Sequence, residues 1–157
     1  MTNNDILRRI RYSLDLSDQH TVALFGLGGI EITESQLLSL LAKEEEDIYH
    51  SCSNEQLLGF LDGLILHNRG PREGSAPPKS AQAEPINNQV FKKLRVALEL
   101  KEEDILSLLS LAGFNVRKPE LTSLFRNPNH KHFKPCGDQF LRNFLQGLAL
   151  QRRHGAE

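Results

Sequence analysis

The side chains best suited to chemistry in this 157-residue chain are two cysteines and two histidines beside one of them: Cys52, Cys136, His130 and His132. Imidazole and thiolate are ligands that Zn²⁺ prefers, so His130, His132 and Cys136 are candidates for a metal-dependent switch or enzyme site. Their spacing is neither C-x-x-C nor H-x-x-x-H, and no further ligand stands close to them in the sequence. A solvated loop is the simpler interpretation. We therefore predict no metal and no cofactor.

Each cysteine stands just before an expected helix, where the helix dipole would lower the pKa of a thiol and favour a redox or nucleophilic role. A nucleophile also needs a base, and no pair of histidine and acid can be placed beside Cys52 or Cys136. Small cysteines are often buried, so we predict that both pack in the core. The sequence thus predicts no catalytic residue and a protein that is not an enzyme.

A glycine-rich segment, Phe25-Gly26-Leu27-Gly28-Gly29, has the composition of a phosphate-binding loop. Such a loop must follow a strand and open a helix, so that its backbone N–H groups point at the phosphates. Here the glycines follow an apolar helical pattern. We therefore interpret Gly29 as the end of a helix, since glycine adopts the left-handed conformation without strain.

The elements that position these residues form an internal repeat. Residues 3–70 align with residues 87–154 without a gap, at a constant offset of 84, and 19 of the 68 aligned positions are identical. Identical pairs include Asn3 and Asn87, Asn4 and Asn88, Arg11 and Arg95, Gly29 and Gly113, Cys52 and Cys136, and Gly63 and Gly147. Such self-similarity predicts two copies of one structural unit.

Apolar residues recur at spacings of three and four in both copies, which predicts helices and no strand. We expect four helices in each copy. In the first copy, the first helix follows Asn4 as an N-cap, the second runs from about Ser17 to Gly29, the third starts at Thr33, with Gln36 completing a capping box, and the fourth follows Ser53. In the second copy, the corresponding helices follow Asn88, run from about Lys101 to Gly113, start around Pro119 and follow Gly137. Gly63 and Gly147 fall inside the fourth helices, where close approach of another helix would explain them.

The predicted fold class is all-α, with two tandem, pseudo-symmetric four-helix units. Residues 1–70 form the first unit and residues 87–157 the second. Residues 71–86 between them are rich in proline, alanine, glycine and serine, which is typical of a flexible linker.

The two copies differ most in charge. Residues 3–70 hold 5 Lys and Arg against 11 Asp and Glu, a net charge of −6, whereas residues 87–154 hold 12 against 6, a net charge of +6. Opposite charges on two copies of one unit favour a protein partner or self-association. The candidate partner-binding residues here are Glu44, Glu45, Glu46 and Asp47 in the first copy, and Arg117, Lys118, Arg126, Lys131 and Lys134 in the second.

Nucleic-acid binding is an open alternative. The first helix of each copy has a basic cluster, and the second and third helices of the second copy, broken at Ala112-Gly113, loosely suggest a helix-turn-helix. A solvated helix face held by i,i+4 pairs such as Arg11–Asp15 is the plainer interpretation. The clustered cations are Arg8, Arg9, Arg11, Lys92, Lys93 and Arg95.

Other functional classes find no support. No apolar run approaches the ~18 residues that a membrane span needs, and the polar N-terminus does not look like a signal peptide. Two cysteines without a disulfide pattern favour a reducing compartment. We therefore expect a cytoplasmic protein with no membrane association, and the sequence identifies no small-molecule substrate.

Three blocks, at residues 3–11, 85–95 and 129–142, carry a resemblance to a known family. They begin with Asn-Asn, Pro-Ile-Asn-Asn and Asn-His-Lys-His, and the chain resembles the YehS-like family of small bacterial proteins over nearly its whole length. The resemblance implies a bacterial cytosolic origin and the tandem arrangement. The family is one of unknown function, so it implies no activity, ligand or catalytic residue.

Overall fold

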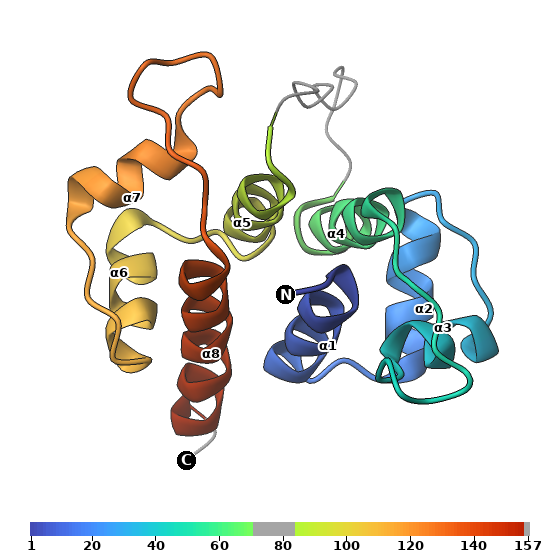
Figure 1. Ribbon diagram of the computed structural model, residues 1–157. Helices are drawn as coiled ribbons and strands as arrows, with labels where there is room; N and C mark the ends of the chain where they lie inside the picture. Colours follow the sequence, from blue (N-terminus) through green and yellow to red (C-terminus); the bar gives the residue numbers. More distant parts are fainter. Residues whose placement is uncertain (71–83, 156–157) are drawn as a thin grey trace. The chain divides into compact units, whose positions relative to one another are not determined.

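The computed structural model describes residues 1–70 and 84–155, and within these ranges it contains helices and no strand (Figure 1). The all-α prediction is therefore confirmed. The helices are α1 (Asn3–Leu14), α2 (Asp18–Leu27), α3 (Glu34–Leu41), α4 (Asn54–Arg69), α5 (Ile86–Ala97), α6 (Glu102–Leu111), α7 (Lys118–Phe125) and α8 (Asp138–Gly155).

The chain divides into two compact units, Met1–Gly70 (unit 1) and Pro71–Glu157 (unit 2). Most of the predicted linker, residues 71–83, lies outside the described residues, and α5 already begins at Ile86. The bounds of α2 and α6, and of α3 and α7, differ by the same 84 residues as the sequence repeat. The repeat is therefore a repeat of three-dimensional structure.

In each unit the core lies mainly between the second and fourth helices, with the first and third helices packed alongside. Fully buried aromatic and leucine side chains fill it. In unit 1 they include Leu7, Leu24, Phe25, Leu57 and Phe60, and in unit 2 the equivalent Phe91, Leu108, Leu109, Leu141 and Phe144.

The predicted helix ends are largely confirmed. The side chains of Ser17, Thr33 and Ser53 each accept a hydrogen bond from a backbone N–H in the first turn of the following helix. Gly29 has φ of 85° and Gly113 has φ of 77°, the left-handed conformation expected at a helix end. The glycine-rich segment therefore terminates α2 and does not form a phosphate-binding loop.

The prediction that Asn4 and Asn88 are N-caps is wrong. The cap of α1 is Thr2, whose Oγ1 accepts from the backbone N of Asp5 at 3.1 Å, and the residue before α5 is Pro85. Asn4 is only 1% exposed and Asn88 is fully buried. Both lie inside their helices with the amide turned into the unit, where it bonds to a distant loop.

The close approach predicted at Gly63 and Gly147 is confirmed. A Cβ atom on Gly63 would overlap the backbone carbonyl of Leu24, and one on Gly147 would overlap that of Leu108. The second and fourth helices of each unit therefore cross with almost no side chain between them. None of the helices in residues 1–70 and 84–155 has both the length and the apolar character required to cross a bilayer.

Candidate functional site

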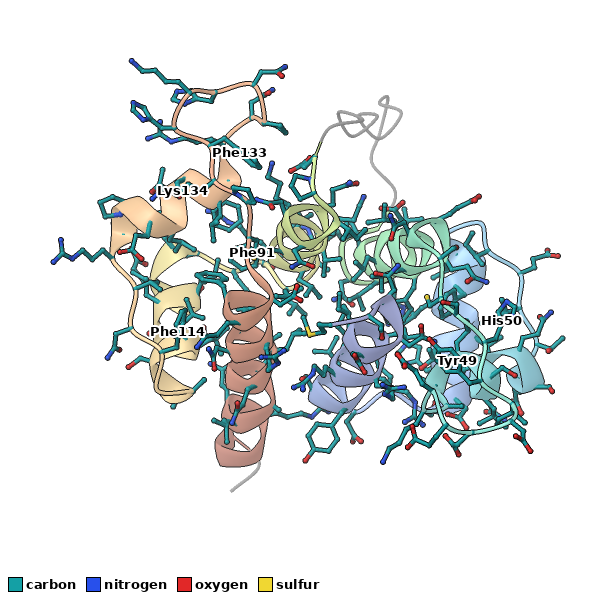
Figure 2. The ribbon with its side chains drawn as sticks, viewed as in Figure 1. Tyr49, His50, Phe91, Phe114, Phe133 and Lys134 are labelled. Carbon is teal, nitrogen blue, oxygen red and sulfur yellow. The ribbon has the colours of Figure 1, made fainter. Side chains whose placement is uncertain are left out.

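The connection between the third and fourth helices has the same backbone in both units, although its side chains differ in charge. In unit 1 it is the acidic loop, residues 42–51, and in unit 2 the basic loop, residues 126–135. Glu46 N donates to Lys43 O at 2.9 Å, and the equivalent His130 N donates to Asn127 O at 2.8 Å. A second turn follows in each loop, closed by the backbone N of Tyr49 or of Phe133. Figure 2 labels both aromatic residues.

Each loop is fastened to its unit by a buried asparagine. The Asn4 Nδ2 donates to the carbonyls of Leu40, at 2.9 Å, and His50, at 2.8 Å, while its Oδ1 accepts from Cys52 N at 2.9 Å. Tyr49 adds a fourth bond, from its hydroxyl to the same Oδ1 at 3.3 Å. One side chain thus holds the end of α3 and the return of the loop towards α4.

Unit 2 repeats this arrangement. The Asn88 Nδ2 donates to the carbonyls of Leu124 and Lys134, both at 3.1 Å, and its Oδ1 accepts from Cys136 N at 2.8 Å. The neighbouring Asn87 donates to Asp138 Oδ1 at 2.7 Å, a bond that lowers the pKa of that carboxyl. The same three asparagine bonds therefore preorganise both loops, and the Tyr49 hydroxyl is an addition of unit 1, since the equivalent Phe133 has no hydroxyl.

The exposed side chains of the two loops have opposite charges. The acidic loop has Lys43 and the four acids Glu44, Glu45, Glu46 and Asp47, a net charge of −3, and all five residues are exposed. The basic loop has Arg126, Lys131 and Lys134 and no acid, a net charge of +3. Lys131 and Lys134 are exposed, and Figure 2 labels Lys134 on this loop.

A family model described as "Protein of unknown function (DUF1456)" matches residues 3–70 and, a second time, residues 87–154. The chain belongs to this family. It is also 45% identical over 152 residues to the "Uncharacterized protein YehS" of Escherichia coli (strain K12), and the alignment covers 97% of each chain. No solved structure matches. The matched segments coincide with the sequence repeat, so each unit is one DUF1456 unit.

Arg117 and Lys118 lie apart from the basic loop of the second DUF1456 unit. They begin α7, whereas the loop follows its other end, and eight helical residues span about 12 Å. Lys118 Nζ also lies 3.6 Å from Glu102 Oε2. Of the predicted cations of this unit, the structure therefore brings together Arg126, Lys131 and Lys134.

The basic residues of the first helices mainly form bonds to other groups within their own DUF1456 unit. The Arg8 Nη1 donates to Ala42 O at 2.7 Å, just beyond α3, and its Nη2 pairs with Asp5. Burial alone would raise the pKa of Asp5, but hydrogen bonds from Thr2 and the Arg8 charge outweigh it and lower that pKa. Arg8 thus satisfies a carbonyl that the end of a helix leaves without a partner.

The equivalent Lys92 donates to Arg126 O at 3.2 Å, beyond α7. The Arg11 Nη2 donates to Asp18 Oδ1 at 2.6 Å, so its salt bridge reaches the first turn of α2. Arg9 is exposed and Lys93 is half-buried. The first helices therefore do not present all six predicted cations as one free surface.

Aromatic rings next to these cations were not predicted as part of a site. The Arg95 guanidinium lies 4.3 Å from the centroid of Phe125, which stacks on Phe91 at 4.7 Å. Lys92 Nζ lies 6.0 Å from the centroid of Phe133. Comparison of the two copies could have indicated these rings, because the first unit has leucine at the positions equivalent to Phe91 and Phe125.

The loose helix-turn-helix resemblance does not match the observed connection. Six residues, 112–117, separate α6 from α7, whereas that motif joins its helices with a turn of three or four residues. The exposed side of α7 also includes Glu120.

Both cysteines are buried, as predicted. Burial raises the pKa of the Cys52 thiol to about 11, and burial together with the nearby Asp138 raises that of Cys136 to about 12. His130 and His132 are exposed on the loop, apart from the Cys136 thiol in the core. Over the described parts of the chain, no three histidine, cysteine or acidic side chains are grouped as metal ligands would be.

We expect both thiols to resist alkylation in the native protein. With a pKa of 11 or above, about 0.1% or less of either thiol is ionised at pH 8, and only the thiolate reacts. Iodoacetamide labelling followed by mass spectrometry should be at least about a hundredfold slower in buffer than in guanidinium chloride. Comparable rates under the two conditions would contradict the buried placement.

Proposed function

We propose that this DUF1456 protein is a non-enzymatic protein-interaction module whose basic loop binds an acidic surface of a partner protein. One observation carries the proposal: the two loops share one backbone and one set of anchors, yet have net charges of +3 and −3. Because Asn4 and Asn88 already fix the backbone, the charges are free to vary without loss of fold.

The basic loop has the properties of a preorganised binding element. Asn88 and the bond from Lys134 N to Ser123 O, at 3.1 Å, hold it in place, so binding costs little backbone entropy. Its cations stand without an acid in the loop itself. Complementary charge increases the association rate and selects among partners more than it raises affinity.

Comparative capture from a lysate of Escherichia coli, the source of the 45% identical relative, tests the proposal. The wild-type chain and the double variant Lys131→Gln/Lys134→Gln are immobilised without a charged tag, and the lysate is treated with nuclease. We expect specific proteins to be retained by the wild type at low salt and to be at least about tenfold depleted on the variant.

The matched control is Arg9→Gln/Lys101→Gln, which removes the same charge from two other exposed positions. This variant should retain the same proteins as the wild type. Equal retention by all three chains, or equal loss in both variants, would contradict a role for the basic loop.

A second candidate is binding of single-stranded nucleic acid by unit 2. The Arg95 guanidinium over Phe125, next to the exposed Lys131 and Lys134 of the basic loop, favours it, because cations bind phosphates and aromatic rings stack on bases. Fluorescence anisotropy with labelled single-stranded RNA and DNA measures it. Affinity that falls steeply with salt and is weakened by Phe125→Leu would support this function; absence of binding at low salt would exclude it.

A further inference from the structure

We propose that unit 1 has a binding site for a borderline transition-metal ion such as Zn²⁺, formed by His20 of α2 and His67 of α4. The two imidazole rings are in edge-to-face contact, with centroids 4.9 Å apart and planes at 73°. The residues lie 47 positions apart in the sequence, so spacing alone gave no sign of the pair. This site is separate from both loops and does not depend on the proposed function.

The scaffold under the pair is closely packed. Gly28 lies against Gly59, and Leu24 against Gly63. Each step of four residues back along α2 is matched by four residues forward along α4, and the next step reaches His20 and His67. The pair thus continues an antiparallel crossing in which backbone meets backbone, and such a crossing fixes the helix positions firmly.

The ring separation suits one metal ion held by both imidazoles. With Zn–N distances of about 2.0 Å and a tetrahedral angle, two coordinated rings have centroids about 5 Å apart. His20 is half-buried and His67 is exposed, so water has access to the remaining coordination positions. For both rings to bind one ion, a nitrogen of each must face it, and the side-chain torsions of the two histidines set that orientation.

Local chemistry favours this pair over the other histidine pair. His130 and His132 have centroids 5.6 Å apart, but His130 Nδ1 accepts from the backbone of His132 and lies 3.2 Å from the Arg126 guanidinium, whose charge repels a cation. In the described part of the chain, no hydrogen bond or ion pair occupies the ring nitrogens of His20 or His67. Residues 3–70 also have a net charge of −6, which attracts cations.

The repeat shows that the crossing does not require these histidines. At the equivalent positions unit 2 has Asp104 and Gln151, although α6 and α8 make the same close approach at Gly147. The histidine pair is therefore specific to unit 1, and the fold of the unit does not require it.

Titration calorimetry of the full, tag-free chain with ZnCl₂ tests the site. We expect one Zn²⁺ per chain, bound in the micromolar range, and affinity reduced about tenfold or more in both His20→Gln and His67→Gln. The variants His50→Gln and His130→Gln/His132→Gln should bind like the wild type. MgCl₂, whose ion prefers oxygen ligands, should give no binding at the same concentrations.

Urea unfolding of unit 1 provides a second measurement, and its result for the wild type does not depend on whether the variants fold. Both tyrosines of the chain, Tyr12 and Tyr49, lie in unit 1 and there is no tryptophan, so tyrosine fluorescence reports on unit 1. Zn²⁺ should shift the urea midpoint of the wild type upwards and leave His20→Gln and His67→Gln unchanged, because an ion bridging α2 and α4 binds only the folded unit. Absence of saturable binding, binding retained in either variant, or binding without this shift would overturn the site.

Discussion

Replacing Asn4 with alanine is expected to destabilise unit 1 by about 3 kcal/mol or more, because each buried group that loses its partner costs about 1–3 kcal/mol. The substitution takes the partner from the carbonyls of Leu40 and His50 and from the N–H of Cys52. Urea unfolding followed by tyrosine fluorescence measures the change in unit 1 directly. The acidic loop should also become susceptible to proteolysis, since its return to α4 is no longer held.

The variant Asn4→Asp isolates the hydrogen bonds from the packing. It preserves the shape of the side chain, but an ionised carboxylate has no proton to donate and would face the oxygens of Leu40 and His50. We expect Asn4→Asp to be at least as destabilising as Asn4→Ala at pH 7. A loss below about 1 kcal/mol for both would show that water replaces the amide and that the loop is not anchored as described.

Asn3 and Asn88 provide the matched comparisons. Asn3 is half-buried and donates to Cys52 O at 3.1 Å and to Asn54, so Asn3→Ala should cost only about 1 kcal/mol. Asn88→Ala should destabilise unit 2 by as much as Asn4→Ala destabilises unit 1, as measured by circular dichroism at 222 nm. Helix content reports on both units, whereas tyrosine fluorescence reports on unit 1 alone.

Local chemistry made the helical framework predictable. The caps at Ser17 and Thr33 and the helix end at Gly29 depend on residues within one turn of the chain, and the sequence contains all of that information. The 84-residue repeat added a test of the helix predictions, because each helix had to agree with the sequences of both copies. The crossing at Gly63 was predictable because glycine inside a helix is unfavourable unless another element needs the space.

Tertiary partners explain what the sequence did not reveal. Asn4 has the residue type of a cap and lies at the start of a helix, but its partners are 36 to 48 residues away. Arg8 looked like a free surface cation, but it satisfies a carbonyl beyond the end of α3. In both cases the residue type indicated correctly which bonds the side chain can form, but the partners come from a distant part of the chain that the local sequence does not identify.

The two units separate what the fold requires from what it leaves free. The asparagine anchor, the buried cysteine and the glycine at the helix crossing are the same in both, and each is buried at a contact between elements. The loop that these residues hold has a net charge of −3 in unit 1 and of +3 in unit 2. A duplicated scaffold with one variable, preorganised loop is an arrangement suited to recognition, which is why the loop carries the proposed function.

Replacing Gly63 with alanine is expected to destabilise unit 1 by about 2 kcal/mol. The new Cβ would overlap the backbone carbonyl of Leu24, so α2 and α4 must move apart, and overpacking of this kind costs about 3 kcal/mol. The better helix propensity of alanine returns about 1 kcal/mol. Tyrosine fluorescence during urea unfolding measures the net change, and Gly147→Ala should have the equivalent effect in unit 2.

Gly26 supplies the control, because the same substitution there should act in the opposite direction. Gly26 also lies in α2, but it is exposed and a Cβ atom added to it meets nothing within 4 Å. Helix propensity then acts alone, so Gly26→Ala should stabilise unit 1 by up to about 1 kcal/mol. If Gly63→Ala were also stabilising, the helices would not be in backbone contact, and the crossing that positions His20 and His67 would have to be looser than the structure describes.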